Sequence, residues 1–149
     1  MYFTKENIKN KKITIIGLKK SGYSAAILAY NFGAEVFVSD YNNDNETKIN
    51  YDRLVKKGIK CEIGKHSDHI FNSNFWVISP GVPKDIDIIH KAEKLNIPII
   101  GEIEFASKFT NKPIVAVTGS NGKTTTVNIL FEILKVGGYK PLLAGNIGK

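Results

Sequence analysis

The sequence is poor in cysteine and contains no long apolar run. Cys61 is the only cysteine among 149 residues, so no intrachain disulfide can form. Its neighbourhood offers only His66 and His69 as further metal ligands, in a polar stretch expected to form a loop, which favours surface histidines over a metal site. The first residues, MYFTKENIKNKK, lack an apolar signal segment, and no run approaches the length of a membrane span. We therefore expect a cytoplasmic protein with no membrane partner.

Arginine is almost absent as well. The net charge of +7 comes from 21 basic residues, of which only Arg53 is arginine. Nucleic-acid-binding proteins usually include arginine for bidentate contacts, so a solvated lysine-rich surface is favoured over a nucleic-acid interface. The positive field should still attract anionic substrates. At 42% hydrophobic and 23% charged residues, the composition is that of a soluble globular protein.

Apolar β-branched runs alternate with amphipathic segments over the first 109 residues. The pattern predicts strands at 12–16, 35–39, 59–63, 75–79 and 97–100. It predicts helices at about 24–32, near 54–55 after the polar run 41–50, at about 85–96, and over 101–109. Strands that alternate with helices form a parallel sheet covered on both faces, and right-handed crossovers make it doubly wound. The predicted fold class is thus α/β, a Rossmann-like sheet.

A second domain is predicted to begin after the linker at 110–113. A buried strand is expected at 114–117, followed by a helix whose apolar face contains Val127, Leu130, Phe131 and Leu134, and by a strand near 142–144. One βαβ unit cannot bury both faces of its own strands. We therefore predict a domain at 1–110 and a truncated domain at 111–149.

A glycine-rich turn joins the predicted strand at 114–117 to the helix that follows. Gly119-Ser120-Asn121-Gly122-Lys123-Thr124 places unpaired backbone N–H groups and the positive end of a helix dipole where they suit a phosphate. Lys123 adds a positive charge, and the Thr124 hydroxyl can ligate Mg²⁺. The general nucleotide-loop pattern has glycine where this sequence has Val117, so the match is the shorter G-x-x-G-K-T. A turn that merely needs glycine is the less favoured interpretation.

The first predicted βα turn has two glycines of the dinucleotide-binding fingerprint. Gly17 and Gly22 match its first and third glycines, while Lys19 replaces the middle one. Asp40 ends the second strand, where an acidic side chain can accept a hydrogen bond from a ribose hydroxyl or a base. A side chain at position 19 disfavours a nicotinamide dinucleotide. A differently posed nucleotide diphosphate that meets Ser21 and the helix N-terminus remains open, as does a plain tight turn.

Ser79-Pro80-Gly81 follows the strand at 75–79, which is expected to lie in the middle of the sheet. Its backbone groups would emerge at the carboxyl edge, where ligands of open α/β sheets bind. Taken alone this motif is weak, because Pro80 and Pro83 also suit a purely structural turn.

Several segments together resemble one family. The sequences VAVTGSNGKTTT, GLKKSGYSAA, SPGV, GEIEF and GNIG occur in the order and spacing of the Mur ligases. The resemblance covers nearly all 149 residues and corresponds to the first domain and the opening of the ATP-binding central domain of these enzymes. Among Mur ligases, the sequence is most similar to those that add D-glutamate.

The resemblance implies ATP-dependent amide bond formation in peptidoglycan synthesis. In the family, the carboxylate of UDP-N-acetylmuramoyl-L-alanine takes the γ-phosphoryl group of ATP, and the amine of D-glutamate displaces phosphate from the acyl phosphate. By matching position, ATP would be bound by Gly119, Ser120, Asn121, Gly122, Lys123, Thr124 and Thr125, with Lys123 and Thr124 catalytic and Thr124 on Mg²⁺. The UDP substrate would meet Ser21, Asp40, Ser79, Pro80, Gly81 and Asn146.

The resemblance also bears on what residues 1–149 do alone. The family's further Mg²⁺ ligands and its D-glutamate-binding domain correspond to nothing in this sequence, so we expect no ligase activity from these residues alone. We also expect a monomer. A stand-alone, non-catalytic uridine-nucleotide-binding module is the main alternative. A nicotinamide-dependent oxidoreductase is a third possibility, and it gives no role to Gly119–Thr124.

Overall fold

The computed structural model describes residues 3–145, which divide into two compact units. The first unit is Met1–Asn111 and the second is Lys112–Lys149, so the division falls inside the predicted linker. Among residues 3–145, no helix is both long enough and apolar enough to cross a membrane.

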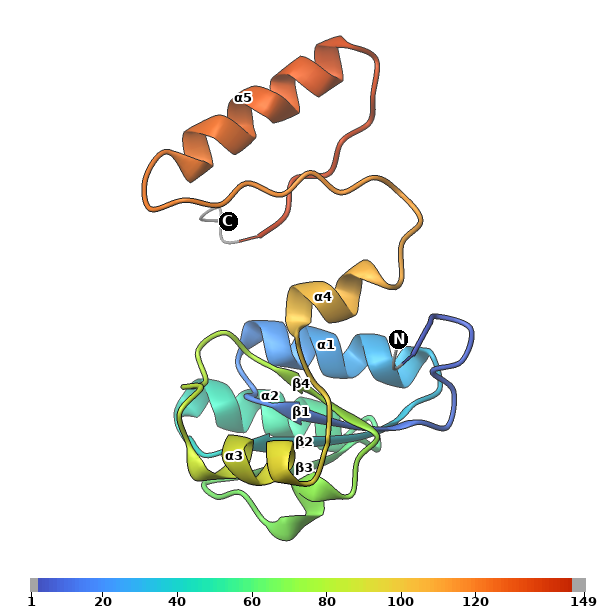
Figure 1. Ribbon diagram of the computed structural model, residues 1–149, viewed down its shortest axis with the longest axis vertical. Coiled ribbons are helices and arrows are strands. Elements are labelled where there is room, and N and C mark those ends of the chain that lie inside the picture. The colour runs from blue at the N-terminus through green and yellow to red at the C-terminus, as the bar shows by residue number, and fades with distance from the viewer. Residues whose placement is uncertain (1–2, 146–149) are drawn as a thin grey trace. The chain divides into compact units, whose positions relative to one another are not determined.

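The first unit is built around a five-stranded parallel sheet (Figure 1), in the order β3-β2-β1-β4-β5. The strands are β1 (Lys12–Ile16), β2 (Glu35–Asp40), β3 (Lys60–Ile63), β4 (Phe75–Ile78) and β5 (Ile99–Gly101). The helices are α1 (Lys20–Asn31), α2 (Asn45–Val55), the 3-10 helix η1 (Asp68–Phe71), α3 (Asp87–Lys94) and α4 (Glu102–Ser107). The α/β fold predicted from the sequence is confirmed.

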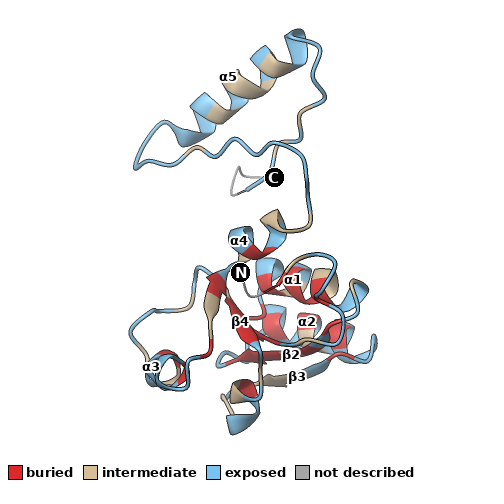
Figure 2. Ribbon diagram, turned by 45° about the vertical axis from the view of Figure 1, so that its right-hand side comes forward, coloured by how far each residue is buried: buried red, intermediate tan, exposed pale blue. Residues whose placement is uncertain are grey.

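Side chains of successive strand residues enter two different cores. Ile13 and Ile15 of β1 belong to the core that includes α1, α2 and Phe105 of α4, whereas Ile16 joins η1 and α3 on the other face. This alternation follows the period of two in a strand. Buried residues accordingly lie on both sides of the sheet in Figure 2, which is the doubly wound arrangement.

Aromatic side chains close one of these cores. The rings of Phe3 and Phe75 stack with their centroids 4.7 Å apart and nearly parallel planes. Phe105 of α4 lies 5.4 Å from Phe3, and Phe109 meets Phe105 edge to face at 5.0 Å. Such pairs add to the free energy gained by burying their area. The segment before β1 and the segment after β5 are thereby fixed to the middle of the sheet.

Two local predictions between β2 and β4 need correction. The polar run at 41–50 was expected to precede a helix, but α2 begins within it at Asn45. The reason is an N-cap, because the carboxylate of Asp44 accepts a hydrogen bond from the backbone N–H of Thr47 at 2.9 Å. The stretch expected to be a loop near residue 68 contains η1, whose Ile70 is fully buried.

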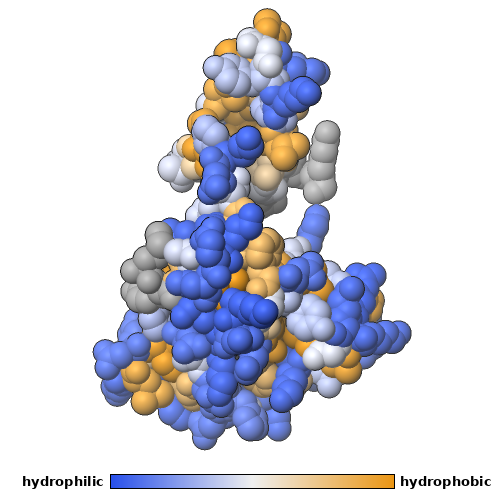
Figure 3. All heavy atoms as spheres, turned by 90° about the vertical axis from the view of Figure 1, so that its right-hand side faces the viewer, coloured by the Kyte–Doolittle hydropathy of each residue, from blue (hydrophilic) through white to orange (hydrophobic). Residues whose placement is uncertain are grey.

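Between residues 112 and 145, the second unit has one helix, α5 (Lys123–Val136), and none of the predicted strands. The predicted apolar face of α5 is confirmed as its least exposed face. However, 114–117 and 142–144 form no strand, and the side chains of Ile114 and Val115 are 59% and 64% exposed. Apolar atoms therefore appear on the surface of this unit, at the top of Figure 3. An extended segment needs neighbours that satisfy its hydrogen bonds and cover its side chains, and this unit supplies too few.

Candidate functional site

The predicted nucleotide-binding segments meet at the carboxyl edge of the sheet. β1 lies between β2 and β4, and Ile16 is in register with Ser39 on one side and Ile78 on the other. The ends of these three neighbouring strands therefore carry, in order across the sheet, Asp40, Gly17 and Ser79. The chain order reverses at β1, and open α/β sheets bind ligands at such a switch point. The structure thus brings together three segments that are distant in the sequence.

The turn after β1 needs glycine because it packs directly against Ser79. Gly17 has a φ of +100°, and a Cβ there would lie 2.8 Å from both the Cβ and the Oγ of Ser79. A Cβ at Gly22 would overlap the carbonyl oxygen of Gly17. Both fingerprint glycines are therefore required by contacts within the turn, so their presence alone identifies no ligand.

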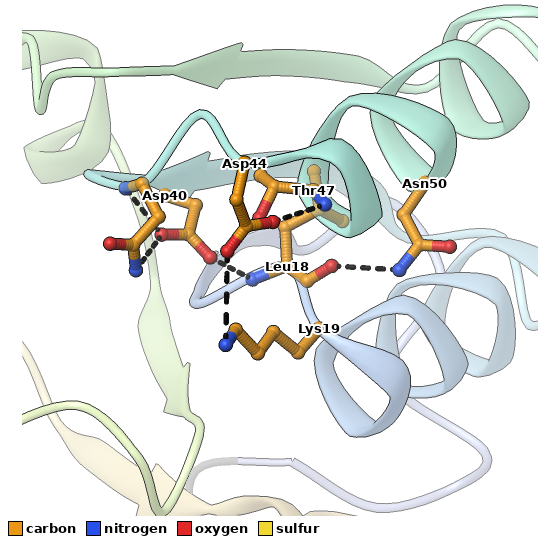
Figure 4. Close-up of polar contacts among 7 residues, drawn as sticks. Leu18, Lys19, Asp40, Asp44, Thr47 and Asn50 are labelled. Atoms are coloured by element: carbon orange, nitrogen blue, oxygen red, sulfur yellow. Dashed lines mark hydrogen bonds and ion pairs between the residues drawn. The ribbon is translucent and has the colours of Figure 1, made fainter.

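Asp40 is buried beneath this turn and holds it in place (Figure 4). Its Oδ2 accepts a hydrogen bond of 2.6 Å from the backbone N–H of Leu18, and its Oδ1 accepts from the backbone and side-chain nitrogens of Asn42 at 2.8 and 3.1 Å. A carboxylate offers about four lone-pair positions, so capacity for a further donor remains. The sequence predicted that Asp40 contacts a ligand. It did not indicate that Asp40 also joins the turn after β1 to the turn after β2.

The same turn is joined to α2 by two further contacts, both drawn in Figure 4. The side-chain amide of Asn50 donates to the carbonyl oxygen of Leu18 at 3.0 Å, and Asn50 is buried. The ammonium group of Lys19 lies 3.8 Å from the Asp44 carboxylate. The hydrogen bond from Thr47 lowers the pKa of Asp44, so the carboxylate stays ionised at neutral pH. The side chain of Lys19 therefore extends toward α2.

The turn after β4 contributes a buried hydroxyl and an exposed tip. Ser79 is 8% exposed, its N–H donates to the carbonyl oxygen of Ile16, and its hydroxyl donates to the carboxylate of Glu102 at the start of α4. Pro80 and Gly81 are exposed, and no atom would lie within 4 Å of a Cβ at Gly81. Exposure leaves this tip open to a ligand. Ser21, in the first turn of α1, is exposed too.

Glu102 is a site residue that the sequence analysis left without a role. It lies in the GEIEF stretch that carried the resemblance, directly after β5. Its position after a strand of the sheet is the signal that could have identified it, because residues at the carboxyl ends of parallel strands meet at one edge.

A second polar cluster lies between the ends of β2 and β3. The hydroxyl of Ser39 donates to Glu62 Oε1 at 2.8 Å and lies 2.7 Å from His66 Nδ1. Glu62 Oε1 also accepts from the backbone N–H of Ser67 at 2.9 Å. Burial opposes ionisation of Glu62, but hydrogen bonds from Ser67 and Ser39 outweigh it and lower its pKa. The hydroxyl proton is therefore committed to an ionised carboxylate.

The hydrogen bond from Ser39 to Glu62 determines which ring nitrogen of His66 carries the proton. The hydroxyl of Ser39 has one hydrogen and donates it to Glu62, so Nδ1 of His66 must be the donor to Ser39 Oγ. Burial lowers the pKa of His66, while the nearby carboxylates of Glu62 and Asp40 partly oppose that shift. A neutral imidazole with its proton on Nδ1 satisfies both observations. The sequence pattern favoured a surface role for His66 over a metal site and gave no sign of this contact with Ser39.

Neither a metal nor a reactive thiol is indicated in this region. Across residues 3–145, no group of three or more His, Cys, Asp or Glu side chains could hold a metal ion. Burial raises the pKa of the Cys61 thiol to about 12, which keeps it protonated at neutral pH.

The predicted phosphate loop precedes α5 in the second unit. Gly119 and Gly122 have φ angles of +144° and +74°, values that favour glycine, and Gly122 is the N-cap of α5. The ammonium group of Lys123 donates to the carbonyl oxygens of Gly119 and, at 3.1 Å, Ser120. Ser120, Asn121, Thr124 and Thr125 are exposed. The predicted site residue Asn146 lies outside the described residues.

The fold and the glycine turn together define a class, that of Rossmann-like α/β domains. A family model for the Mur ligase MurD-like N-terminal domain matches residues 11–101. The chain therefore belongs to the Mur ligase family.

Relatives and solved structures agree with this family. The chain is 42% identical over 143 residues to the UDP-N-acetylmuramoylalanine-D-glutamate ligase of Koribacter versatilis, and 40% identical over 151 residues to that of Chloroherpeton thalassium. These alignments cover 95% and 98% of this chain but only 32% of each relative. The chain thus spans about a third of the length of the curated relatives it matches.

Two solved Mur ligases share the fold. The UDP-N-acetylmuramate-alanine ligase of Thermotoga maritima is 29% identical, with a TM-score of 0.57 over 85% of this chain and 29% of its own. The UDP-N-acetylmuramate:L-alanyl-gamma-D-glutamyl-meso-diaminopimelate ligase from Neisseria meningitides is 25% identical, with a TM-score of 0.59 over 87% of this chain and 40% of its own.

Proposed function

We propose that the first unit binds the uridine nucleotide of UDP-N-acetylmuramoyl-L-alanine, in a ligase that adds D-glutamate to it using ATP. The observation that carries this proposal is that Gly17, Asp40 and Ser79 meet at the switch point of the sheet. The relatives of this chain are named as D-glutamate ligases, which supports the choice of substrate. The reaction belongs to the whole enzyme and would proceed through an acyl phosphate in peptidoglycan synthesis.

The N-terminus of α1, the Asp40 carboxylate and the exposed tip at Pro80 and Gly81 are the parts that can contact the nucleotide. The N-terminus of α1 carries Lys19, Lys20 and the exposed Ser21 and has no acidic residue in its first turn. Helix N-terminal N–H groups and these side chains suit a diphosphate. The remaining acceptor capacity of Asp40 and the exposed backbone at Pro80 and Gly81 suit the polar edge of a base or ribose.

The loop Gly119–Gly122 fits the phosphates of ATP by its backbone and its charge. The left-handed glycines leave the helix N-terminus without a capping side chain, so N–H groups of α5 remain available. The ammonium group of Lys123 would exchange its carbonyl partners for phosphate oxygens and offset their charge. ATP supplies the phosphoryl group when bound, and Thr124 would contribute one hydroxyl ligand to Mg²⁺.

A calorimetric titration tests the nucleotide site. Chain 1–149 should bind UDP-N-acetylmuramoyl-L-alanine and, more weakly, UDP. NAD is the matched control, and we expect no binding because Lys19 replaces the middle glycine of the dinucleotide-binding fingerprint. Tighter binding of NAD than of UDP would contradict the proposal.

Asp40→Asn provides the variant for this titration. The amide nitrogen cannot accept a hydrogen bond, so Asp40→Asn loses either the bond from Leu18 or those from Asn42. We expect about 1.5–3 kcal/mol of lost stability as well as weaker UDP binding. Gly81→Ala is the control for folding, because it changes a residue of the same site where nothing lies within 4 Å of the added Cβ. Folding should be unaffected by that change.

Ligase activity is expected to require more than this chain. The loop residues Ser120, Asn121 and Thr124 are exposed, and α5 buries none of its residues, so nothing described here encloses a reacting phosphate. Purified chain 1–149 should release no phosphate from ATP in the presence of UDP-N-acetylmuramoyl-L-alanine and D-glutamate. Substrate-dependent phosphate release by this chain would refute that expectation.

A further inference from the structure

The turn that carries Asp40 is anchored by a cluster on the next strand. Ser39 immediately precedes Asp40, is fully buried, and contacts both Glu62 and His66 through its hydroxyl. Glu62 belongs to β3, and His66 lies in the loop that follows it. Because Asp40 is the next residue in the chain, a shift of the Ser39 backbone would also shift Asp40.

The backbone joins the same two loops. The N–H of Gly64 donates to the carbonyl oxygen of Asp40 at 2.9 Å and lies 3.3 Å from that of Asn42. Gly64 has a φ of +79°, which turns the chain sharply after β3. The ring of the exposed Tyr41 lies 6.1 Å from the ring of His66. Side-chain, backbone and ring contacts thus all hold the loop after β3 against the loop after β2.

We propose that His66 is a positioning residue of the nucleotide site, which through Ser39 and Glu62 fixes the turn that places the Asp40 carboxylate. Nδ1 of His66 supplies the hydrogen that Ser39 Oγ accepts, while the hydroxyl proton satisfies Glu62. Removing the imidazole leaves a buried hydroxyl oxygen without a donor and frees the loop at Lys65–His66. That the site binds a uridine nucleotide rests on the proposed function. That His66 positions the turn carrying Asp40 does not depend on it.

Hydrogen exchange in the absence of ligand tests the positioning. In His66→Leu, the amides of Leu18 and Gly64, which donate to Asp40, should exchange about tenfold faster, while amides of β4 keep their rates. His66→Asn should stay within about threefold of wild type, since its side-chain N–H can replace Nδ1–H. His69→Asn is the matched control on the exposed histidine of η1 and should change neither amide. Unchanged rates in His66→Leu, or equally faster exchange in β4, would overturn the proposal.

Ser39→Ala breaks the same contact from the other side and serves if His66→Leu fails to fold. It should raise the same two amide rates. Ser39→Ala also removes the hydrogen bond to Glu62, so the double variant should exchange no faster than Ser39→Ala alone, because the contact that His66→Leu removes is already absent there. Additive effects of the two changes would overturn the proposal.

Titration with UDP then tests the consequence for binding. His66→Leu should weaken UDP binding about tenfold, with His66→Asn within about threefold and His69→Asn unchanged. Faster exchange with unaltered UDP affinity would overturn the inferred role in the nucleotide site. If wild-type chain binds no UDP, the proposed function fails, and the exchange experiment still decides whether His66 positions Asp40.

Discussion

The two units of this chain contain similar sequence patterns, but the patterns form buried secondary structure only in the first unit. Residues 13–16 and 114–117 are both short apolar runs rich in β-branched side chains. The first run is a buried central strand between β2 and β4, whereas Ile114 and Val115 are mostly exposed and belong to no strand. Likewise α1 buries three alanines against the sheet, while α5 buries no residue. Such a run becomes a strand only where neighbouring strands and covering helices exist.

Matched phenylalanine truncations should give the largest difference between the units. Phe75 is fully buried and stacked on Phe3, so Phe75→Ala should lower the free energy of unfolding by about 3–5 kcal/mol. Phe131 in α5 is only half-buried, and Phe131→Ala should cost less than about 1 kcal/mol. Urea unfolding monitored by circular dichroism measures both. Comparable losses would show that the second unit is packed as firmly as the first.

Matched glycine substitutions sharpen the comparison. Gly17 and Gly122 both have positive φ angles, but only Gly17 has neighbours that a Cβ would overlap. Gly17→Ala should therefore cost more than about 2 kcal/mol through strain and displacement of Ser79. Gly122→Ala carries only the backbone strain, about 1 kcal/mol, confined to the start of α5. The urea midpoint should fall clearly for the first variant alone, and a reversed order would contradict the assigned contacts.

The pH dependence of stability should arise in the first unit. Burial lowers the pKa of folded His66, so the unfolded chain takes up a proton more readily, and stability falls as pH drops below about 6.5. His66→Asn should flatten this decline. His90 behaves oppositely, because its hydrogen bond with Asp85 raises its pKa, so its small contribution is present at low pH and lost as pH rises. Thermal unfolding of wild type, His66→Asn and His90→Asn between pH 5 and 8 measures these signs, and a steeper decline in His66→Asn would contradict the buried neutral form.

The smallest effect is expected at Lys19. Its ion pair with Asp44 spans 3.8 Å with both side chains about half exposed. Exposed pairs of this kind contribute about 0–1 kcal/mol, so Lys19→Gly should leave the unfolding midpoint nearly unchanged. A large destabilisation would mean that Lys19 supports the turn after β1 more than its one ion pair indicates.

The sequence predicted most of the first unit because its patterns were long and separated by clear turns. The predicted bounds of β1 agree with the structure, as do those of β2 and β4 within one residue. The start of α2 was misplaced because Asp44 acts as an N-cap inside a run that looked like a loop. η1 was missed because a short 3-10 helix has no periodic pattern long enough to recognise.

The candidate site was predicted in part. Gly17, Asp40 and Ser79 were recognised because each follows a predicted strand, and a parallel sheet brings strand ends to one edge. Their actual partners were not predictable from spacing. Leu18 donates to Asp40 from 22 positions away, and Ser79 donates to Glu102 from 23 positions away.

The sequence by itself determined the fold class, the strands of the first unit and the residue types at the glycine turns, since these follow from local periodicity and from backbone angles that favour glycine. Only the tertiary structure decided which buried polar groups meet. Asp40 ties the turn after β1 to the turn after β2. Ser39, Glu62 and His66 hold the turn after β2 to the loop after β3. Tertiary neighbours also decided that the run at 114–117 stays exposed, because a strand's hydrogen bonds and buried faces are supplied by other segments of the chain.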